Sequence, residues 1–271
     1  MGGKQYFDFI VCVVVYRNYL DLEELLNSIR MNIKEDCHVI IVNNFCDEES
    51  EKIIENIAIN NGCDFIHSEN NGYGAGNNIA IDFALHHYEF RYCIISNPDI
   101  IINTLSLEAI DNQQGIIAPC ITTKTGKMQN PMVVYDIPLA TALVYKGLKN
   151  DSKVAFFTGL LINKMTRDLW RLQRKEKRKK FSRIYMAHGS FVIIDRESLQ
   201  RLHPIYDEKM FLFAEEGLLA IKARQLGVSI WYTDLIRIFH KEDGSMKFRN
   251  DINLQLKQSN IYVYEKYYKE E

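Results

Sequence analysis

The chain has 271 residues, of which 47% are hydrophobic and 25% are charged, and its formal net charge is −2 at pH 7. This composition is typical of a soluble globular protein and gives no overall basic field, so we expect no nucleic-acid partner. Its six cysteines are scattered and form no Cys-x-x-Cys pair, which indicates reduced thiols and a cytoplasmic protein. The longest apolar runs are too short to span a membrane, and the N-terminus lacks the features of a signal peptide.

The first hundred residues predict an alternation of strands and helices. Runs of apolar, β-branched residues alternate with segments in which apolar residues recur at helical spacing. The predicted strands are 9–15, 39–42, 63–67 and 91–96. The predicted helices between them are 20–33, 48–60 and 75–87. Such an alternation with short connections is typical of βαβ units, so we expect a doubly wound α/β fold with a mostly parallel central sheet flanked by helices.

The second half of the chain is less regular. The predicted strands there are 116–122, 188–194, 228–232 and 236–239. One predicted helix begins at Arg196, and two more cover 215–226 and 251–268. Residues 124–160 show no clear periodicity. With no repeat and no low-complexity linker, the chain is predicted to be one continuous domain.

A proline follows the predicted strand 91–96, in the segment Asn97-Pro98-Asp99. Proline cannot donate to a β-ladder and favours an extended residue before it, so the strand should end here. Asp99 would then lie just past the carboxyl end of a strand, where open α/β sheets bind ligands. Taken alone, the segment is better explained as an ordinary turn.

The segment ENNGYGAGNNIAI (69–81) places three glycines at alternate positions before a predicted helix. Backbone amides at such a helix N-terminus can contact a ligand, although a glycine-built loop without a ligand is as good an interpretation. The spacing is not G-x-G-x-x-G and the segment follows the third strand, so a dehydrogenase is disfavoured.

Two further places carry candidate chemistry. Glu215 and Glu216 open a predicted helix, where carboxylates are favoured by the helix dipole. They directly follow the apolar segment 210–213, and apolar surroundings raise a carboxylate pKa toward that of a general base. His240 ends a predicted strand, and a single histidine there is more often structural. Together with Asp99 it suggests a site for a hard cation completed by diphosphate oxygens.

The order of these motifs carries more information than any one of them. In chain order the segments are VVVYRN, VNNF, NNGYGAGNN, SNPD, GSFVIIDR, FLFAEEGLLAIKARQLG and FHKEDGS. This succession resembles the family 2 inverting glycosyltransferases of GT-A fold, and most of all their rhamnosyltransferase-like branch. The resemblance extends over roughly residues 7–268. It implies a nucleotide-diphosphate-sugar donor, a Mn²⁺ or Mg²⁺ cofactor, and sugar transfer with inversion at the anomeric carbon.

The resemblance implies a single GT-A domain over residues 1–271. Its nucleotide-binding half would cover about 7–100, its metal, acceptor and catalytic half about 101–240, and its C-terminal helix 250–268. The implied activity is that of a hexosyltransferase that moves a sugar from a UDP- or dTDP-sugar to a hydroxyl of a glycan or lipid-linked acceptor. Such enzymes work in bacterial polysaccharide or glycoconjugate biosynthesis.

Carried over position by position, the resemblance also implies roles for single residues. The residues expected to bind the donor are Val14, Val15, Tyr16, Asn43, Asn71, Gly76, Asn78, Asn97 and Asp99. Asp99 and His240 are expected to hold the metal. Glu216 stands at the position of the catalytic base, which takes the proton from the acceptor hydroxyl, and Glu215 is the reserve candidate.

Departures from the family pattern keep a second interpretation open. Asn43 and Glu216 stand where the family usually has Asp, and Leu218 replaces a further Asp. The alternative is a catalytically inactive GT-A relative that binds a nucleotide-sugar or a protein. A nucleotidyltransferase is disfavoured, because the sequence after the first strand lacks a Gly-rich basic signature.

Residues 171–183 (RLQRKEKRKKFSR) contain eight basic residues and one acidic residue. Such a run is most often a solvated charged face. Because it follows the amphipathic-looking LLINKMTRDLW, it also suggests peripheral contact with an anionic membrane at its inner face.

Overall fold

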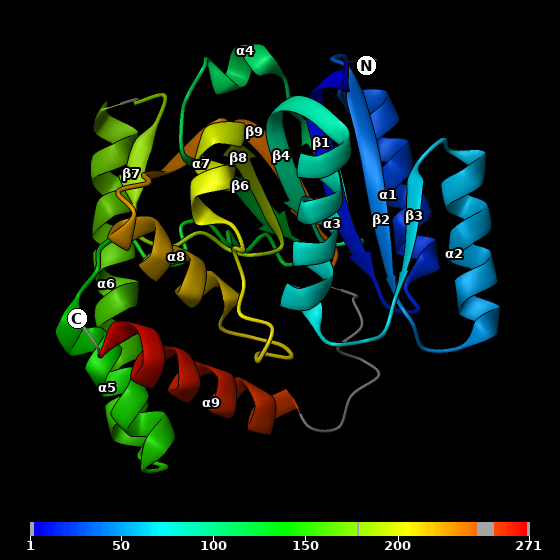
Figure 1. Cartoon of the computed structure of the whole chain (residues 1–271). Helices are drawn as coiled ribbons and strands as arrows, with labels where there is room; N and C mark the ends of the chain where they lie inside the picture. Colours follow the sequence, from blue (N-terminus) through cyan, green and yellow to red (C-terminus); the bar gives the residue numbers. More distant parts are fainter. Residues whose placement is uncertain (1–2, 178, 243–251, 270–271) are drawn as a thin grey trace.

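The computed structural model describes residues 3–177, 179–242 and 252–269 of the chain, and the side chains of 175–177 and 252 are left undescribed. In these ranges the strands form one nine-stranded sheet with helices on both faces (Figure 1). The strands are β1 (Gln5–Val15), β2 (Cys37–Asn44), β3 (Asp64–Ser68), β4 (Tyr88–Ser96), β5 (Ile100–Thr104), β6 (Ile116–Thr123), β7 (Ser182–Ile184), β8 (Phe191–Asp195) and β9 (Ile230–His240).

The helices that the structure describes connect these strands and close the chain. They are α1 (Tyr19–Asn32), α2 (Glu48–Asn60), α3 (Tyr73–His87), α4 (Leu107–Ile110), α5 (Pro138–Lys149), α6 (Lys153–Lys177), α7 (Arg196–Leu202), α8 (Glu215–Gln225), α9 (Ile252–Val263) and the π-helical turn η2 (Tyr264–Tyr268). Among the described residues, no helix is both long and apolar enough to cross a bilayer.

The sheet has the order β3-β2-β1-β4-β8-β6-β9-β5, and β7 pairs with β9. The strands β3, β2, β1 and β4 are parallel neighbours, as the alternation in the first hundred residues predicts. β8 lies antiparallel between β4 and β6, and β9 runs parallel to β6. The α/β fold class expected from the sequence is therefore confirmed.

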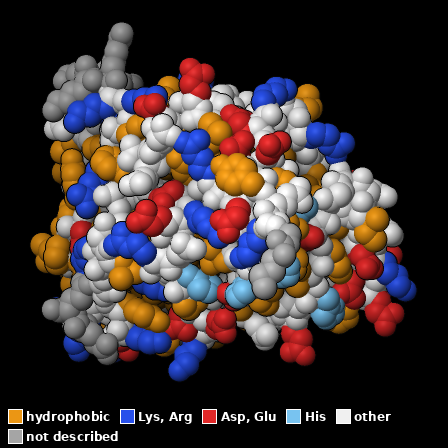
Figure 2. Space-filling view, turned by 45° about the horizontal axis from the view of Figure 1, so that its top comes forward, with side chains coloured by type: hydrophobic (Ala, Val, Ile, Leu, Met, Phe, Trp, Pro, Cys, Tyr) orange, Lys and Arg blue, Asp and Glu red, His pale blue; other side chains and the backbone are white. Residues whose placement is uncertain are grey.

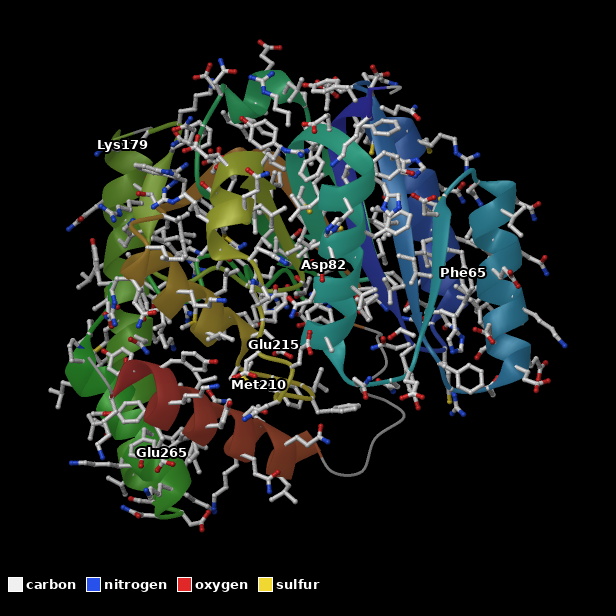
Figure 3. All side chains as sticks on the ribbon, viewed as in Figure 1. Phe65, Asp82, Lys179, Met210, Glu215 and Glu265 are labelled. Carbon is white, nitrogen blue, oxygen red and sulfur yellow. The ribbon has the colours of Figure 1, made fainter. Side chains whose placement is uncertain are left out.

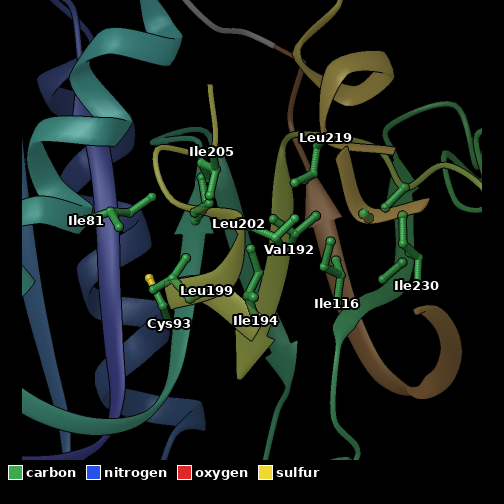
Figure 4. Close-up of a cluster of buried hydrophobic side chains, with 14 of the residues drawn as sticks. Ile81, Cys93, Ile116, Val192, Ile194, Leu199, Leu202, Ile205, Leu219 and Ile230 are labelled. Atoms are coloured by element: carbon green, nitrogen blue, oxygen red, sulfur yellow. The ribbon is translucent and has the colours of Figure 1, made fainter. Parts of the chain in front are cut away.

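The two faces of the sheet carry two separate apolar clusters. Successive side chains of β1 point to opposite faces, so Ile10 and Cys12 belong to one cluster while Val11 and Val13 belong to the other. The first cluster lies under α3, α7 and α8, and Figure 4 shows part of it. The second lies under α1 and α2. Burial on both faces explains why these strands are continuously hydrophobic.

The structure differs from the sequence prediction in its second half. The predicted strands 228–232 and 236–239 are one strand, β9, whose pairing with β6 shifts register between Pro119 and Cys120. This irregularity interrupts the apolar pattern and made one strand look like two. β5, which begins directly after Pro98-Asp99, was not predicted. Residues 124–160, which showed no clear periodicity, contain α5 and the beginning of α6.

Candidate active site

A cleft of about 380 Å³ opens beyond the carboxyl ends of β1, β4 and β9. Most of the candidates at these strand ends and at the start of α8 line it. They are Val14, Tyr16, Asn97, Asp99, Glu215, Glu216 and His240. The sheet topology thus brings together groups that lie far apart in the sequence, at the edge where open α/β sheets bind ligands.

Asp99 and His240 are neighbours because of strand pairing. β5 and β9 are antiparallel, and Ile100 pairs with His240. Asp99 therefore stands beside His240, and the backbone N–H of Lys241 donates to the carbonyl oxygen of Asp99 at 3.0 Å. Oδ1 of Asp99 lies 3.3 Å from Nε2 of His240, and both side chains are buried. β4 itself ends at Ser96, and the N–H of Asn97 still donates to Ser190 O at 2.8 Å.

His240 is oriented by a second layer of hydrogen bonds. Its Nδ1 lies 2.8 Å from Oε1 of Gln129, and Nε2 of Gln129 donates to Oε1 of Glu242 at 2.9 Å. Since the Gln129 carbonyl oxygen can only accept, Nδ1 of His240 carries a proton. In the neutral imidazole, Nε2 then presents its lone pair toward the Asp99 carboxylate. A proton or a metal ion between the two groups is needed to make this approach favourable.

The donor set of Asp99 and His240 fits a divalent metal with open coordination positions. Carboxylate oxygen and imidazole nitrogen both suit Mn²⁺, and carboxylate oxygen suits Mg²⁺. Within residues 3–177, 179–242 and 252–269, no three His, Cys, Asp or Glu side chains converge as a complete metal site. A metal held by Asp99 and His240 therefore needs further oxygen ligands, which a diphosphate can supply.

Glu215 and Glu216 enter the cleft from the first turn of α8. The preceding residues Phe213 and Ala214 have left-handed backbone angles, with φ of 72° and 68°. Glu215 is 5% exposed, and its Oε1 has no hydrogen-bond partner among the residues that the structure describes. Figure 3 shows Glu215 beside the lower end of α3. Burial, and then the neighbouring charge of Glu216, raise the pKa of Glu215 to about 8. Glu215 is therefore largely protonated at neutral pH.

The Glu216 carboxylate is held by the backbone before β8. The N–H of Gly189 donates to Oε1 of Glu216 at 3.3 Å. A Cβ atom at position 189 would lie 2.9 Å from that same oxygen, so glycine leaves room for the carboxylate.

His188 also lines the cleft, and the sequence analysis gave it no role. Its Nδ1 lies 2.9 Å from Oγ of Ser190, and its ring centroid is 5.8 Å from that of His240. Burial lowers its pKa, which favours the neutral ring at neutral pH. The only available signal was its position directly before the Gly-Ser that leads into β8.

Several predicted donor-binding residues do not line the cleft. Val15 and Gly76 are packed inside the protein, and Asn71 is exposed. Asn78 is buried and exchanges hydrogen bonds with the backbone of Tyr206, at 3.0 and 3.2 Å. Asn43 is buried and donates to Oε1 of Glu51 at 3.3 Å. These contacts give structural explanations for residues that the resemblance assigned to the donor.

Asn44, the next residue of β2, lines the cleft in place of Asn43. Its Nδ2 donates to the carbonyl oxygen of Gly72 at 3.1 Å, and its buried Oδ1 has no hydrogen-bond partner within the described part of the chain. Gly72 has a φ of 105°, and a Cβ there would lie 2.2 Å from the carbonyl oxygen of Phe211. The glycine loop therefore packs tightly against the loop that leads to Glu215.

Residues 10–110 match the sequence model of the family described as Glycosyl transferase family 2. Solved structures that resemble nearly the whole chain include the following two. The crystal structure of GalNAc-T7 with UDP, GalNAc and Mn²⁺ has a TM-score of 0.64 and 14% identity, over 97% of this chain and 49% of that one. The crystal structure of TarS from S. aureus has a TM-score of 0.57 and 15% identity, over 95% of this chain and 39% of that one.

The fold is that of the GT-A glycosyltransferases. At these identities the two structures establish the fold, and the chain spans half or less of their lengths. No curated protein matches the sequence significantly. The family match over β1 to α4, together with the fold, supports a glycosyltransferase.

Proposed function

We propose that the chain is a metal-dependent, inverting glycosyltransferase of hexosyl type. It transfers a sugar from a UDP- or dTDP-sugar to a hydroxyl of a glycan or lipid-linked acceptor, in bacterial polysaccharide or glycoconjugate biosynthesis. One observation carries the proposal: the pair Asp99–His240 and the pair Glu215–Glu216 line the same cleft. The cleft therefore offers a place for a metal-held diphosphate and a carboxylate base within one site.

In this proposal the metal is Mn²⁺ or Mg²⁺, and the Asp99 carboxylate and Nε2 of His240 would hold it. A bound divalent cation offsets the negative charge that develops on the diphosphate as the glycosidic bond breaks. Gln129 keeps Nδ1 of His240 protonated and so keeps Nε2 available as a ligand. The GalNAc-T7 structure, whose fold this chain shares, contains UDP and Mn²⁺, which supports a nucleotide donor and a divalent metal in this proposal.

Glu216 acts as the general base in this proposal. Its carboxylate is stabilised by the N–H of Gly189 and takes the proton from the acceptor hydroxyl as that oxygen attacks the anomeric carbon. A displacement with inversion forms no covalent sugar–enzyme intermediate, so one base is sufficient. Glu215 is less suited to this role at neutral pH, because burial keeps it largely protonated.

The proposal is tested with a panel of UDP-, dTDP- and GDP-sugars in the presence of Mn²⁺. Thermal shift identifies the donor, because a ligand that binds the native state raises its apparent stability. Transfer and donor hydrolysis are then measured for wild type and Glu216→Gln. We expect Glu216→Gln to bind the donor with nearly unchanged affinity and to lose transfer by about 10²-fold or more. Equal activity of the variant would exclude Glu216 as the base.

One observation favours the alternative of an inactive relative that binds a nucleotide-sugar or a protein. Leu218 stands where the family has an Asp, and it is buried in an apolar cluster with Met210, Ile221 and Val263. The side chain at that position therefore contributes to apolar packing and provides no carboxylate. If the wild type binds a donor with Mn²⁺ but neither transfers nor hydrolyses any sugar, the binding function replaces the enzymatic one.

A further inference from the structure

The helix α6 carries a long apolar stripe on its outer face. The stripe is formed by residues that recur every three or four positions and are each more than half exposed. They are Val154, Phe157, Leu161, Met165, Leu169 and Leu172. With a rise of about 1.5 Å per residue, the stripe is about 27 Å long. Figure 2 shows hydrophobic side chains along the left edge of the molecule, where α6 lies in Figure 1.

The other side of α6 is fixed to the protein. Trp170 is buried in the main cluster, with its ring 5.4 Å from that of Tyr232, and Gly159 allows close contact with α5. The stripe therefore cannot turn inward without breaking this packing. Contiguous apolar surfaces of this length are unusual on monomeric proteins in water and indicate an interaction site.

Basic charge is concentrated on the same helix. The sequence of α6 contains seven Lys and Arg residues against two acidic residues, although the whole chain has a net charge of −2. At its C-terminal end lies a groove of about 910 Å³, lined by Arg171, Arg174, Lys179 and Lys180 together with Trp170 and Leu172. Figure 3 labels Lys179 at this end of the helix.

The acidic partners of these cations are mostly exposed. Lys180 pairs with Asp111 at 2.9 Å and Arg171 with Asp168 at 3.7 Å, and each carboxylate is more than half exposed. Exposed ion pairs of this kind contribute little stability, so they exchange readily for other anions. Arg174 is held more firmly, because it stacks 4.9 Å from the ring centroid of Tyr232 and also pairs with Asp234.

We propose that the α6 stripe and the adjoining basic groove dock this protein on an anionic lipid bilayer, with α6 lying in the plane of the interface. The stripe enters the boundary of the acyl region, and the cations of the groove contact lipid phosphates. A second copy of this chain is a poorer occupant than an anionic surface, because each α6 carries a net positive charge and two such helices repel each other. The sequence suggested membrane contact through 171–183 as an alternative to a solvated charged face, and the apolar stripe continues from there back to Val154. The docking does not depend on the proposed transfer reaction.

The experiment is co-sedimentation of the full chain with vesicles of phosphatidylcholine alone and of phosphatidylcholine mixed with phosphatidylglycerol. We expect binding to the mixed vesicles only. The double variant Phe157→Ser/Leu161→Ser should lower the partition coefficient by about tenfold or more, because the stripe loses buried apolar area. The control is Met31→Ser/Ile59→Ser, which removes two equally exposed apolar side chains from α1 and α2 and should bind like wild type.

The charge contribution is tested separately with Arg171→Gln, Lys179→Gln and Lys180→Gln. Each should lower the partition coefficient about fivefold, and added salt should abolish the differences. Lys52→Gln, an exposed residue of α2, is the control. Absence of wild-type binding, or equal loss in the control variants, overturns the proposal. So does a dimeric mass in solution that Phe157→Ser/Leu161→Ser converts to a monomer, since the stripe is then covered by a second copy.

Discussion

Gln129 orients His240 through a contact of 2.8 Å between its Oε1 and Nδ1 of the imidazole. The two residues are more than a hundred positions apart in the sequence. They meet because the segment after β6 folds back on that strand, with the N–H of Gln129 donating to Ile121 O at 3.0 Å, and β6 runs beside β9. The contact places the ring proton on Nδ1 and leaves Nε2 to face Asp99. Second-layer contacts of this kind tune a metal site as much as the ligands do.

The first prediction concerns this orienting contact. Gln129→Leu removes the acceptor for Nδ1, so the proton is free to move to Nε2, where it competes with a metal. We expect the Mn²⁺-dependent affinity for UDP or dTDP to fall by about tenfold to a hundredfold, as measured by titration calorimetry. Gln114→Leu, an exposed position outside the cleft, is the control. Unchanged Mn²⁺-dependent affinity in Gln129→Leu would show that Gln129 does not contribute to metal binding.

The second prediction concerns Asp99 itself. Asp99→Asn keeps the size of the side chain but removes its charge, and the backbone contact to Lys241 stays in place. We expect nucleotide binding to lose its dependence on Mn²⁺, while binding without metal changes little. Calorimetry with and without Mn²⁺ measures both quantities. Asp8→Asn, at the opposite end of β1, is the matched control, and equal Mn²⁺ dependence in Asp99→Asn and wild type contradicts the metal role.

The carboxyl ends of the first parallel strands could be predicted from the sequence, because most of these strands are continuous apolar runs and Pro98 closely follows the last of them. The contact between Asp99 and His240 could not be derived from local pattern, because it depends on the pairing of β5 with β9. β5 has only five residues, which is too short for periodicity to identify. Gln129 reaches the cleft from a segment that shows no regular pattern, so no local signal marks it. His188 begins the predicted strand 188–194, and only its position before Gly189-Ser190 distinguishes it.

Asn43 and Asn44 show that a difference of one position decides whether a side chain lines the cleft. Neighbouring side chains on a strand point to opposite faces of the sheet. Asn43 therefore turns toward Glu51 of α2, while Asn44 turns toward Gly72 and the cleft. A motif match fixes the strand but not the face, so a shift of one residue exchanges a packed amide for one that lines the site.

The third prediction concerns the pH dependence of stability. Burial raises the pKa of Glu215 to about 8, from an ordinary value near 4.5. The folded state therefore holds this proton more tightly than the unfolded state, and the stabilisation is complete below pH 4.5 and lost as pH rises through about 8. Glu215→Gln carries no charge to ionise, so its Tm should rise relative to wild type between pH 6 and pH 9. Thermal unfolding across this range is the measurement, and a constant difference in Tm contradicts the burial of an ionisable Glu215.

The last prediction concerns the loop before α8, which the C-terminal helix fixes in place. Oδ2 of Asp207 accepts hydrogen bonds from Tyr262, Lys266 and Tyr267 at 2.6 to 2.7 Å. Burial works against the charge of Asp207, but the hydrogen bonds from Lys266, Tyr267 and Tyr262 outweigh it and hold its pKa below the usual range. Further along the same loop, Leu212 accepts a hydrogen bond from Ser259 of α9 at 2.7 Å.

Removing the Asp207 charge should therefore loosen the segment that positions Glu215 and Glu216. We expect Asp207→Asn to lower the free energy of unfolding by about 1–3 kcal/mol in urea titrations at neutral pH. The difference from wild type should shrink as pH falls below 3.8, because protonation of Asp207 removes the same charge in the wild type. Asp151→Asn, whose exposed carboxylate pairs with Lys257 of the same helix, is the control and should change stability little. If Asp207→Asn proves as stable as this control, the C-terminal helix does not fix the loop through Asp207.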